Sequence, residues 1–250
     1  MKFSVIVPTF QEEKWIRACL ESIRNQDFPR NEFEIIVSDA NSTDSTGKIA
    51  KELADKVLTT VTRGIAHGRN VGAKSASGEF LLFVDADVQL DPTFLKECQP
   101  SLVSPGCVAV TGIPRPMDGT SFHKLIYKAT YWTVRLFHFF GLSYFPGICV
   151  AYRKDAFDKV GGFREDFGIV EDLDLSRRIS FMGSCVMNGK ATAQVSTRRL
   201  HKHAFSTIAF HLYNHARYLL TGKAARQYPK IEEINSWLDI CRINSSNRKG

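Results

Sequence analysis

Short apolar runs alternate with amphipathic segments along the N-terminal part of the chain, and this alternation restricts the possible folds most strongly. Residues 3–8, 33–38 and 80–84 are apolar runs of strand length, and residues 56–60 form a shorter one. Between the first two runs, apolar residues recur at helical spacing over residues 15–23. Strands that alternate with helices are typical of a sheet wrapped by helices, so we predict an α/β fold with a mostly parallel sheet.

The second half of the chain has a less regular pattern, but elements can still be assigned to it. Apolar runs predict strands over residues 107–111 and 148–152. Helical spacing of apolar residues recurs along the rest of the sequence. Beyond the first helix, one is predicted to follow the polar turn at residues 39–44, and others cover residues 70–77, 122–140, 172–182 and 205–220.

The composition is that of an ordinary globular protein with an excess of basic residues. Of the 250 residues, 44% are hydrophobic and 24% are charged, and the formal net charge is +7. This charge favours anionic partners such as a nucleotide diphosphate, a lipid phosphate or an acidic membrane surface. Lys and Arg are spread along the chain without a dense basic block, which argues against nucleic acid as a partner.

Cysteines and apolar stretches indicate the compartment. The six cysteines form no C-x-x-C pair, which predicts free, buried thiols in a reducing compartment. The apolar run at residues 3–8 is too short for a signal peptide. Glycine and proline interrupt the charge-free residues 136–152, so this stretch is a poor membrane span. We therefore predict a cytoplasmic protein, which can still contact the inner face of a membrane.

Asp85 and Asp87 follow directly after the apolar run at residues 80–84. Side chains at positions i and i+2 point the same way in an extended segment, so both carboxylates can face one site. Ligands of α/β sheets gather at the carboxyl ends of the strands, where residues 9–12 and 39–44 should also lie. A divalent cation shared with a phosphate, protonation of one Asp, or pairing with Arg can each relieve the repulsion between the carboxylates. The position favours the cation.

Glu171 and Asp172 stand at the start of a predicted helix. Acidic residues in a first helical turn can simply interact favourably with the helix dipole. A carboxylate in a partly desolvated cleft can also act as a general base toward an acceptor hydroxyl. The sequence around the pair leaves both interpretations open.

Two basic segments could bind anions. Residues 64–72 combine three glycines with Arg69 at the start of a predicted helix, where backbone N–H groups can cradle a phosphate. Residues 198–203 form a cationic cluster after a strand-like segment. This cluster can bind phosphate, can supply His201 or His203 to a metal ion, or can be a solvated loop.

These features occur together in an order that resembles a known family. The motifs are VPTFQEE at residues 7–13, SDANSTDST at 38–46, RNVG at 69–72, FVDAD at 83–87, GGF at 161–163 and EDLDL at 171–175. In order and spacing they resemble the family 2 glycosyltransferases over roughly residues 3 to 200. The resemblance implies a GT-A fold and an inverting reaction on a nucleoside-diphosphate sugar, with UDP or GDP as the nucleotide.

The resemblance also implies a role for each matching residue. The nucleotide-binding set is Pro8, Thr9, Phe10, Glu12, Asp39, Arg69, Asp85 and Ala86. Within this set Asp39 contacts the base and Arg69 approaches the diphosphate. Asp87 is the expected ligand of Mg2+ or Mn2+, with Asp85 and His201 as further candidates. Asp172 is the expected base and Glu171 helps to position the acceptor.

The resemblance is accompanied by two departures. Asp39-Ala40-Asn41 replaces the Asp-Asp/Asn-Gly-Ser type of loop that is usual in the family, which affects the contacts with base and ribose. The Gln-x-x-Arg-Trp motif and the membrane spans of processive synthases are missing, since residues 175–179 read LSRRI. We therefore expect transfer of a single sugar to an acceptor hydroxyl or phosphate, on a lipid-linked acceptor or a growing glycan.

The expected organisation is a catalytic domain followed by an extension. Residues 1–203 form the GT-A domain, in which 1–112 bind the nucleotide and 113–203 bind the acceptor, and residues 204–250 form a helical extension. Two other classes of protein are weighed against this interpretation. A sugar-1-phosphate nucleotidyltransferase would need a glycine-rich loop after the first strand, which residues 9–12 do not provide. A noncatalytic nucleotide-binding domain would leave Glu171-Asp172 unexplained.

The predicted helix at residues 122–140 has two possible partners. Its apolar stripe includes Phe122, Trp132 and Leu136, and its other face carries Lys124 and Arg135. Packing of the stripe against the sheet is the favoured interpretation. Aromatic residues opposite basic ones are also typical of a helix that lies in a membrane interface, so peripheral membrane contact is the alternative.

Overall fold

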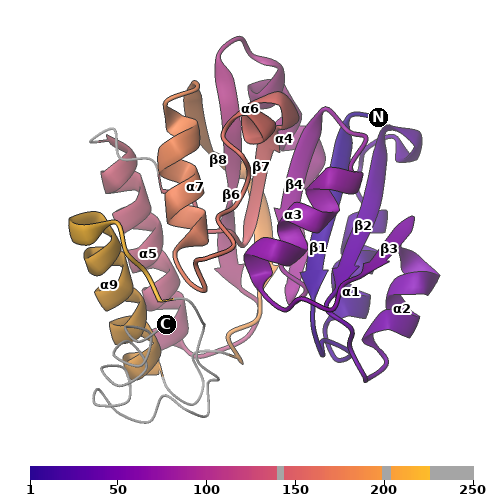
Figure 1. Cartoon of the computed structure of the whole chain (residues 1–250), viewed down its shortest axis with the longest axis horizontal. Coiled ribbons are helices and arrows are strands. Elements are labelled where there is room, and N and C mark those ends of the chain that lie inside the picture. Colours follow the sequence, from indigo (N-terminus) through magenta and orange to yellow (C-terminus); the bar gives the residue numbers. More distant parts are fainter. Residues whose placement is uncertain (140–143, 199–203, 226–250) are drawn as a thin grey trace.

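The computed structural model describes residues 1–139, 144–198 and 204–225, and the side chains from residue 208 onward in the last range. Within this part the fold is built on one eight-stranded sheet with the strand order β3-β2-β1-β4-β7-β6-β8-β5 (Figure 1). The strands are β1 (Phe3–Thr9), β2 (Phe33–Asp39), β3 (Lys56–Thr59), β4 (Phe80–Val84), β5 (Val88–Leu90), β6 (Cys107–Pro116), β7 (Cys149–Arg153) and β8 (Ser184–Val195). β1 pairs in parallel with β2 and β4, and β2 with β3, so these four strands end at the same edge.

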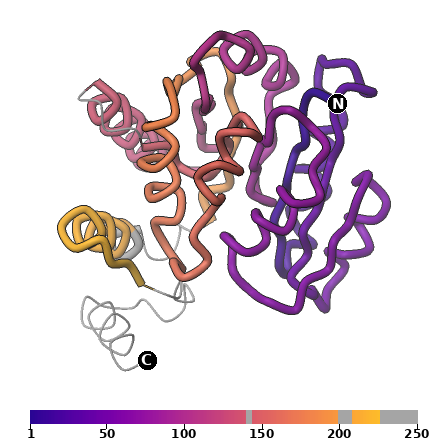
Figure 2. Tube along the Cα trace, turned by 45° about the horizontal axis from the view of Figure 1, so that its top comes forward, coloured from indigo at the N-terminus to yellow at the C-terminus, as the bar shows by residue number. Residues whose placement is uncertain are grey.

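Helices cover both faces of the sheet. Those described are α1 (Ile16–Arg24), η1 (Arg30–Glu32), α2 (Thr46–Leu53), α3 (Ile65–Ser75), α4 (Phe94–Val103), α5 (Ser121–Phe139), α6 (Lys154–Lys159), α7 (Glu171–Ser180) and α9 (Ala204–Thr221). α1, α2 and α4 pack on one face, and α3, α6 and α7 on the other. α5 and α9 both lie on the side of the molecule away from β1, β2 and β3 in Figure 1 and Figure 2, and Figure 2 shows them apart from each other.

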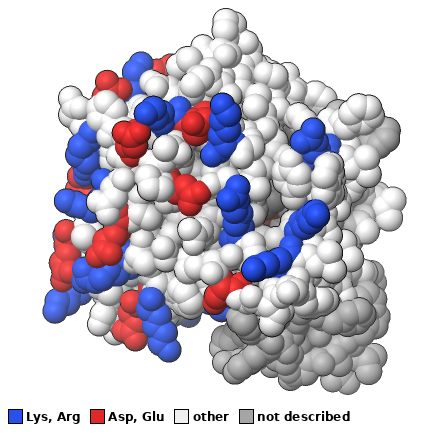
Figure 3. Space-filling model, turned by 180° about the vertical axis from the view of Figure 1, so that it is seen from behind, with Lys and Arg blue, Asp and Glu red and all other residues white. Residues whose placement is uncertain are grey.

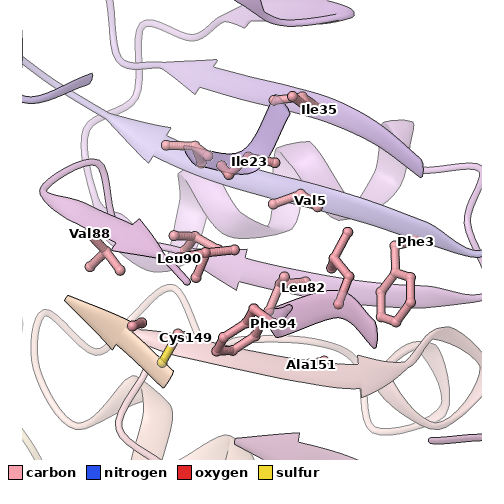
Figure 4. Packing of buried hydrophobic residues seen from close by; sticks show 14 of the residues in the cluster. Phe3, Val5, Ile23, Ile35, Leu82, Val88, Leu90, Phe94, Cys149 and Ala151 are labelled. Atoms are coloured by element: carbon pink, nitrogen blue, oxygen red, sulfur yellow. The ribbon is translucent and has the colours of Figure 1, made fainter. Parts of the chain in front are cut away.

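The pleat of the strands explains why both faces need helices. Val5 and Val7 of β1 belong to one buried cluster, whereas Ile6 between them belongs to the other. Successive side chains of a strand point to opposite faces, so a continuous apolar run is stable only when both faces are covered. Figure 4 shows the first cluster, in which Leu82 and Ala151 from neighbouring strands pack with Phe94 of α4.

Two glycines allow α3 to lie close to β1. A Cβ atom on Gly72 would stand 2.4 Å from Cγ2 of Ile6, and one on Gly68 would stand 3.2 Å from Cβ of Pro8. A larger residue at position 72 would therefore push the helix away from the strand. The close approach places Arg69, between these glycines, at the carboxyl edge of the sheet.

The predicted fold class is confirmed, and the strands predicted over the N-terminal part are all present. α3 begins at Ile65 rather than at residue 70, because the glycines that suggested a bend lie within the helix. β5, α4 and α6 were not predicted as elements, and β8 corresponds to the strand-like segment noted before residue 198. β5 has three residues and α4 contains Pro100, so neither gives a clear periodic signal.

The favoured prediction for α5 is wrong, because its apolar stripe faces away from the sheet. The inward side of α5 carries the buried His123 and Val134. The outward residues and their exposed fractions are Phe122 (57%), Leu125 (62%), Trp132 (56%) and Leu136 (54%). Helical spacing shows that an apolar face exists, but it does not show which surface covers that face.

α9 packs onto the second half of the sheet domain. Phe210 and Tyr218 of α9 share a buried cluster with Phe167, Ile169 and Leu173, which precede or begin α7. The predicted domain limit at residue 203 stays a prediction.

Five cysteines in the described part are free and buried, as expected, whereas Cys241 lies outside it. No described helix has the length and apolarity needed to cross a membrane.

Glu34 holds the first part of the sheet together from within. Its side chain is 5% exposed and lies 2.8 Å from Nζ of Lys56. It accepts hydrogen bonds from Oγ of Ser4 at 2.7 Å and from the backbone N–H and the hydroxyl of Ser77 at 2.7 and 2.6 Å. Burial acts to raise the pKa of Glu34, but the hydrogen bonds from Lys56, Ser77 and Ser4 lower it to about 2.

We expect Glu34→Gln to lower the free energy of unfolding at pH 7 by about 2–3 kcal/mol. The pKa of Glu34 is lower in the folded state, so its contribution is complete above about pH 4.5 and is lost as the pH falls toward 2. Urea denaturation at pH 7 and at about pH 3 measures both effects, and the variant and the wild type should differ less at the lower pH. Glu79→Gln, at an exposed position, is the control and should change stability by less than about 0.5 kcal/mol. An equal loss of stability at both values of pH would show that the ionised carboxylate of Glu34 is not the source of the stabilisation.

Candidate functional site

The loops that follow β1 and β2 form one hydrogen-bonded unit at the carboxyl edge. The backbone N–H of Gln11 donates to Oγ of Ser42 at 2.9 Å, and its side-chain amide donates to Oγ1 of Thr43 at 2.8 Å. The N–H of Glu12 donates to Oγ1 of Thr46 at 2.7 Å. Gln11 and Asn41 both have positive φ angles of 57°, which is uncommon for residues other than glycine. The two loops are therefore held in one defined arrangement.

The predicted nucleoside residues line this unit. Phe10 is partly exposed, and Cζ of Arg63 lies 4.3 Å from the centre of its ring. Asp39 is buried and accepts hydrogen bonds from the N–H and the hydroxyl of Ser42 at 3.1 and 2.6 Å. Oγ1 of Thr9 is buried without a hydrogen-bond partner in the described part of the chain. A polar atom of this kind, next to an aromatic ring at a sheet edge, is suited to a ligand.

Arg69 connects the two sides of the site. Its side chain is almost completely buried on α3, and its guanidinium donates to Oδ1 of Asp85 at 2.9 Å and to Oε1 of Glu171 at 2.9 Å. A third hydrogen bond reaches the carbonyl oxygen of Gly147 at 2.8 Å. A Cβ atom on Gly147 would stand 2.7 Å from Nη2 of Arg69, so this position requires glycine. Arg69 thereby fixes the end of β4 relative to the start of α7.

Glu171 and Asp172 occupy the first turn of α7 and differ in exposure. Glu171 is buried, and burial together with the charge of Asp172 raises its pKa to about 7, although Arg69 acts in the opposite direction. Asp172 is half-buried, and its Oδ2 accepts a hydrogen bond from the N–H of Gly147 at 2.9 Å. Val170 before them has a φ angle of 63°, which is strained for a β-branched residue. After this strained turn Asp172 stays partly exposed, whereas Glu171 is buried.

Arg198 holds the two remaining carboxylates. Its guanidinium donates to both carboxylate oxygens of Glu12 at 2.6 and 2.7 Å, and its Nε donates to Oδ2 of Asp87 at 2.8 Å. Cζ of Arg198 also lies 5.5 Å from the centre of the Trp15 ring. Pairing with Arg, which the sequence left open, is thus how the structure accommodates both Asp85 and Asp87. The sequence placed Arg198 in a cationic cluster but gave no signal that it pairs with Glu12 and Asp87.

Two carboxylates meet at one positive group in this part of the site. Asp87 contacts Nε of Arg198, whereas Glu12 contacts its two terminal nitrogen atoms. No group of three His, Cys, Asp or Glu side chains suited to a metal ion occurs among the residues that the structure describes. Mg2+ commonly binds to one or two carboxylates and completes its shell with substrate phosphates and water. His201, the other predicted ligand, lies outside the described residues.

A mostly parallel sheet with acidic loops gathered at its carboxyl edge defines the GT-A class of folds. Residues 4–161 match the family model described as glycosyl transferase family 2. The match covers more than half of the sequence, and the chain therefore belongs to this family. The resemblance seen in the sequence motifs is thereby confirmed.

Relatives and solved structures agree with this assignment. The poly(ribitol-phosphate) beta-N-acetylglucosaminyltransferase TarS of Staphylococcus aureus (strain Mu50) is 46% identical over 103 residues, which are 39% of this chain and 18% of TarS. A Methanococcus voltae enzyme, dolichyl N-acetyl-alpha-D-glucosaminyl phosphate 3-beta-D-2,3-diacetamido-2,3-dideoxy-beta-D-glucuronosyltransferase, is 39% identical over 100 residues, 37% of this chain and 31% of that one. This chain spans less than a third of the length of either curated relative.

The structural neighbours cover more of the chain. The structure of S. aureus TarS residues 1–349 in complex with UDP-GlcNAc has a TM-score of 0.61 at 29% identity, and covers 79% of this chain and 59% of that one. A mannosyltransferase from Pyrobaculum calidifontis, solved with GDP-Man and Mn2+, has a TM-score of 0.72 at 24% identity. The match covers 100% of this chain and 76% of the mannosyltransferase chain. The GT-A fold predicted from the sequence is confirmed.

We expect Arg198→Ala to bind Mn2+ about tenfold more tightly than the wild type when no nucleotide is present. Removal of the guanidinium leaves Glu12 and Asp87 with unbalanced negative charge, which favours a divalent cation. Isothermal titration with Mn2+ measures the affinity directly. Arg198→Lys keeps the charge and should stay near the wild-type value, and Asp87→Ala should weaken binding. Unchanged or weaker Mn2+ binding by Arg198→Ala would show that Arg198 does not compete for these carboxylates.

Proposed function

We propose that this chain is a metal-dependent, inverting glycosyltransferase that moves a single sugar from a UDP- or GDP-sugar to an acceptor. The observation that carries the proposal is the position of the half-buried Asp172, which accepts a hydrogen bond from Gly147 and follows Glu171, the residue that Arg69 joins to Asp85. One carboxylate is thus available to an acceptor, while others face the donor side. A general base and a leaving-group site on opposite sides of a sugar lead to inversion.

The donor side is formed by the loops after β1, β2 and β4. Pro8, Thr9, Phe10 and Asp39 are the proposed contacts to the nucleoside, and the TarS complex with UDP-GlcNAc supports a nucleotide sugar at this edge. Asp85 and Ala86 are the proposed contacts to the ribose and diphosphate. Asp87, with Asp85 and His201 as further candidates, is proposed to hold Mg2+ or Mn2+. The bound cation would neutralise the charge that develops on the departing diphosphate.

The chain's own residues organise the transfer step. The carboxylate of Asp172 takes the proton of the acceptor hydroxyl. At the same time the oxygen of that hydroxyl forms a bond to the anomeric carbon of the donor sugar. The bond from that carbon to the diphosphate oxygen breaks, and its electron pair leaves with the nucleoside diphosphate. The N–H of Gly147 orients Asp172 through its hydrogen bond, and Glu171 is proposed to position the acceptor. Arg69 keeps the donor and acceptor sides at a constant separation.

The acceptor is proposed to be lipid-linked or a growing glycan. The Methanococcus voltae relative is named for a dolichyl-phosphate-linked acceptor, and TarS is named for a poly(ribitol-phosphate) acceptor. A hydroxyl or a phosphate on such a molecule can serve as the nucleophile. Peripheral contact with the inner face of a membrane accords with a lipid-linked acceptor, and the cytoplasmic location stays a prediction.

Product analysis tests the reaction class. The protein is incubated with a panel of UDP- and GDP-sugars and Mn2+, and we expect release of the nucleoside diphosphate from the correct donor. Release of a sugar 1-phosphate from the nucleotide sugar would indicate nucleotidyl transfer instead, and no turnover of any donor would favour a noncatalytic binding domain. The anomeric configuration of the transferred sugar, measured by NMR, tests inversion.

We expect Asp172→Asn to lower the rate of transfer by about 10²–10⁴-fold, because an amide cannot take the proton of the acceptor. Its affinity for the nucleotide sugar should stay within about threefold of the wild type, since Asp172 faces the acceptor. Steady-state kinetics and titration with the donor measure the two quantities separately. Asp158→Asn, an exposed change on α6, is the matched control and should retain full activity. Wild-type turnover by Asp172→Asn would show that another group is the base.

A further inference from the structure

The outward side of α5 is an apolar surface without a partner among the residues that the structure describes. Phe122, Leu125, Trp132 and Leu136 recur at helical spacing on this side, and each is more than half exposed. Monomeric proteins rarely leave several large apolar side chains exposed along one face. The inward side of the same helix already packs on β6, so α5 is anchored to the domain while its outer side is available.

Basic residues flank this apolar surface. Lys124, Lys128 and Arg135 are exposed on α5, and Cζ of Arg135 lies 5.7 Å from the centre of the Trp132 ring. Neither α5 nor α9 contains Asp or Glu, and none occurs in residues 119–154 or 175–231 of the sequence. No acidic residue of α5 itself therefore offsets the positive charge of Lys124, Lys128 and Arg135.

α9 adds a second apolar surface on the same side of the molecule. Leu212, Leu219 and Leu220 are 66%, 49% and 85% exposed, and α9 lies on the same side as α5 in both ribbon views (Figures 1 and 2). In Figure 3, acidic side chains lie among basic ones toward the left, whereas the right, away from the N-terminal strands, shows basic and uncharged residues. We call the exposed Phe122, Leu125, Trp132 and Leu136 of α5 with Leu212 and Leu220 of α9 the α5–α9 surface.

We infer that the α5–α9 surface binds the interface of an anionic lipid bilayer. Trp, Phe and Leu on one side of a helix, with Lys and Arg beside them, are what an interfacial helix requires. The apolar side chains enter the boundary between lipid headgroups and acyl chains. The basic side chains reach the lipid phosphates and contribute through charge attraction. A second copy of the chain fits less well, because two-fold pairing would bring the same uncompensated basic residues together.

The surface lies next to the acceptor side of the site. The ring of Tyr144 contacts His215 of α9, with a hydrogen bond of 3.1 Å between Oη of Tyr144 and Nε2 of His215. Burial, with the nearby charges of Asp172 and Glu171, raises the pKa of Tyr144, so this ring also lies near the catalytic pair. An acceptor anchored in the bilayer could therefore reach Asp172. This last step rests on the proposed function, whereas bilayer binding itself does not.

Flotation of the full chain with vesicles tests the inference. Vesicles of phosphatidylcholine with about one third phosphatidylglycerol are compared with phosphatidylcholine alone, without nucleotide or metal. We expect binding to the anionic vesicles that weakens as NaCl is raised. The double variants Trp132→Asp/Leu136→Asp and Lys124→Glu/Lys128→Glu should each bind at least about tenfold more weakly.

Matched variants separate the surface from general effects of charge and exposure. Phe181→Asp changes a residue that is 87% exposed beyond α7, and Lys48→Glu/Lys51→Glu reverses two exposed charges on α2. Both should float like the wild type. Release of nucleoside diphosphate from a donor without vesicles should be unchanged in every variant, which separates this test from that of the proposed function.

Three results would overturn the inference. The first is a wild-type chain that does not float with anionic vesicles. The second is unchanged flotation of Trp132→Asp/Leu136→Asp. The third is a dimer, seen by sedimentation equilibrium, that these substitutions dissociate without changing flotation, because the surface would then serve a second copy of the chain.

Discussion

The buried guanidinium of Arg69 is the contact on which the geometry of the site depends. A buried positive charge is costly unless it is paired and hydrogen-bonded, and Asp85, Glu171 and the carbonyl of Gly147 together serve the two terminal nitrogen atoms of Arg69. Asp85 directly follows β4 and Glu171 begins α7, so one side chain joins the end of a parallel strand to the start of that helix. The close packing of α3 on β1, which Gly72 permits, is what brings the guanidinium to this position.

Arginine also explains how a strongly acidic edge is stable before any ligand binds. Asp85 is paired with Arg69, and Asp87 and Glu12 are paired with Arg198. The two arginines differ in burial: Arg69 is enclosed, whereas the side chain of Arg198 is 30% exposed. A buried ion pair is costly to break, so we expect Arg69 to keep its contacts with Asp85 and Glu171. The more exposed Arg198 can exchange its carboxylates with an arriving cation at lower cost.

The sequence predicted those parts of the structure that leave a local signal. Apolar runs identified the parallel strands, and the polar residues after them identified the loops that carry Asp39, Asp85 and Asp87. Pairings between distant residues leave no such signal: Arg198 is separated by 111 positions from Asp87 and by 186 from Glu12. The outward orientation of the apolar side of α5 was missed for a related reason. Periodicity defines a face of a helix, but the packing of other elements decides whether that face is buried.

α7 joins the chemistry of the site to the C-terminal helix. Its first turn carries Glu171 and Asp172, and Asp174 in the same turn accepts a hydrogen bond from Oη of Tyr218 in α9 at 2.9 Å. The preceding Val170, held in a strained conformation, is buried in the cluster that α9 completes. A strained turn persists only where surrounding packing enforces it. The packing of α9 therefore helps to hold the turn that precedes Glu171 and Asp172.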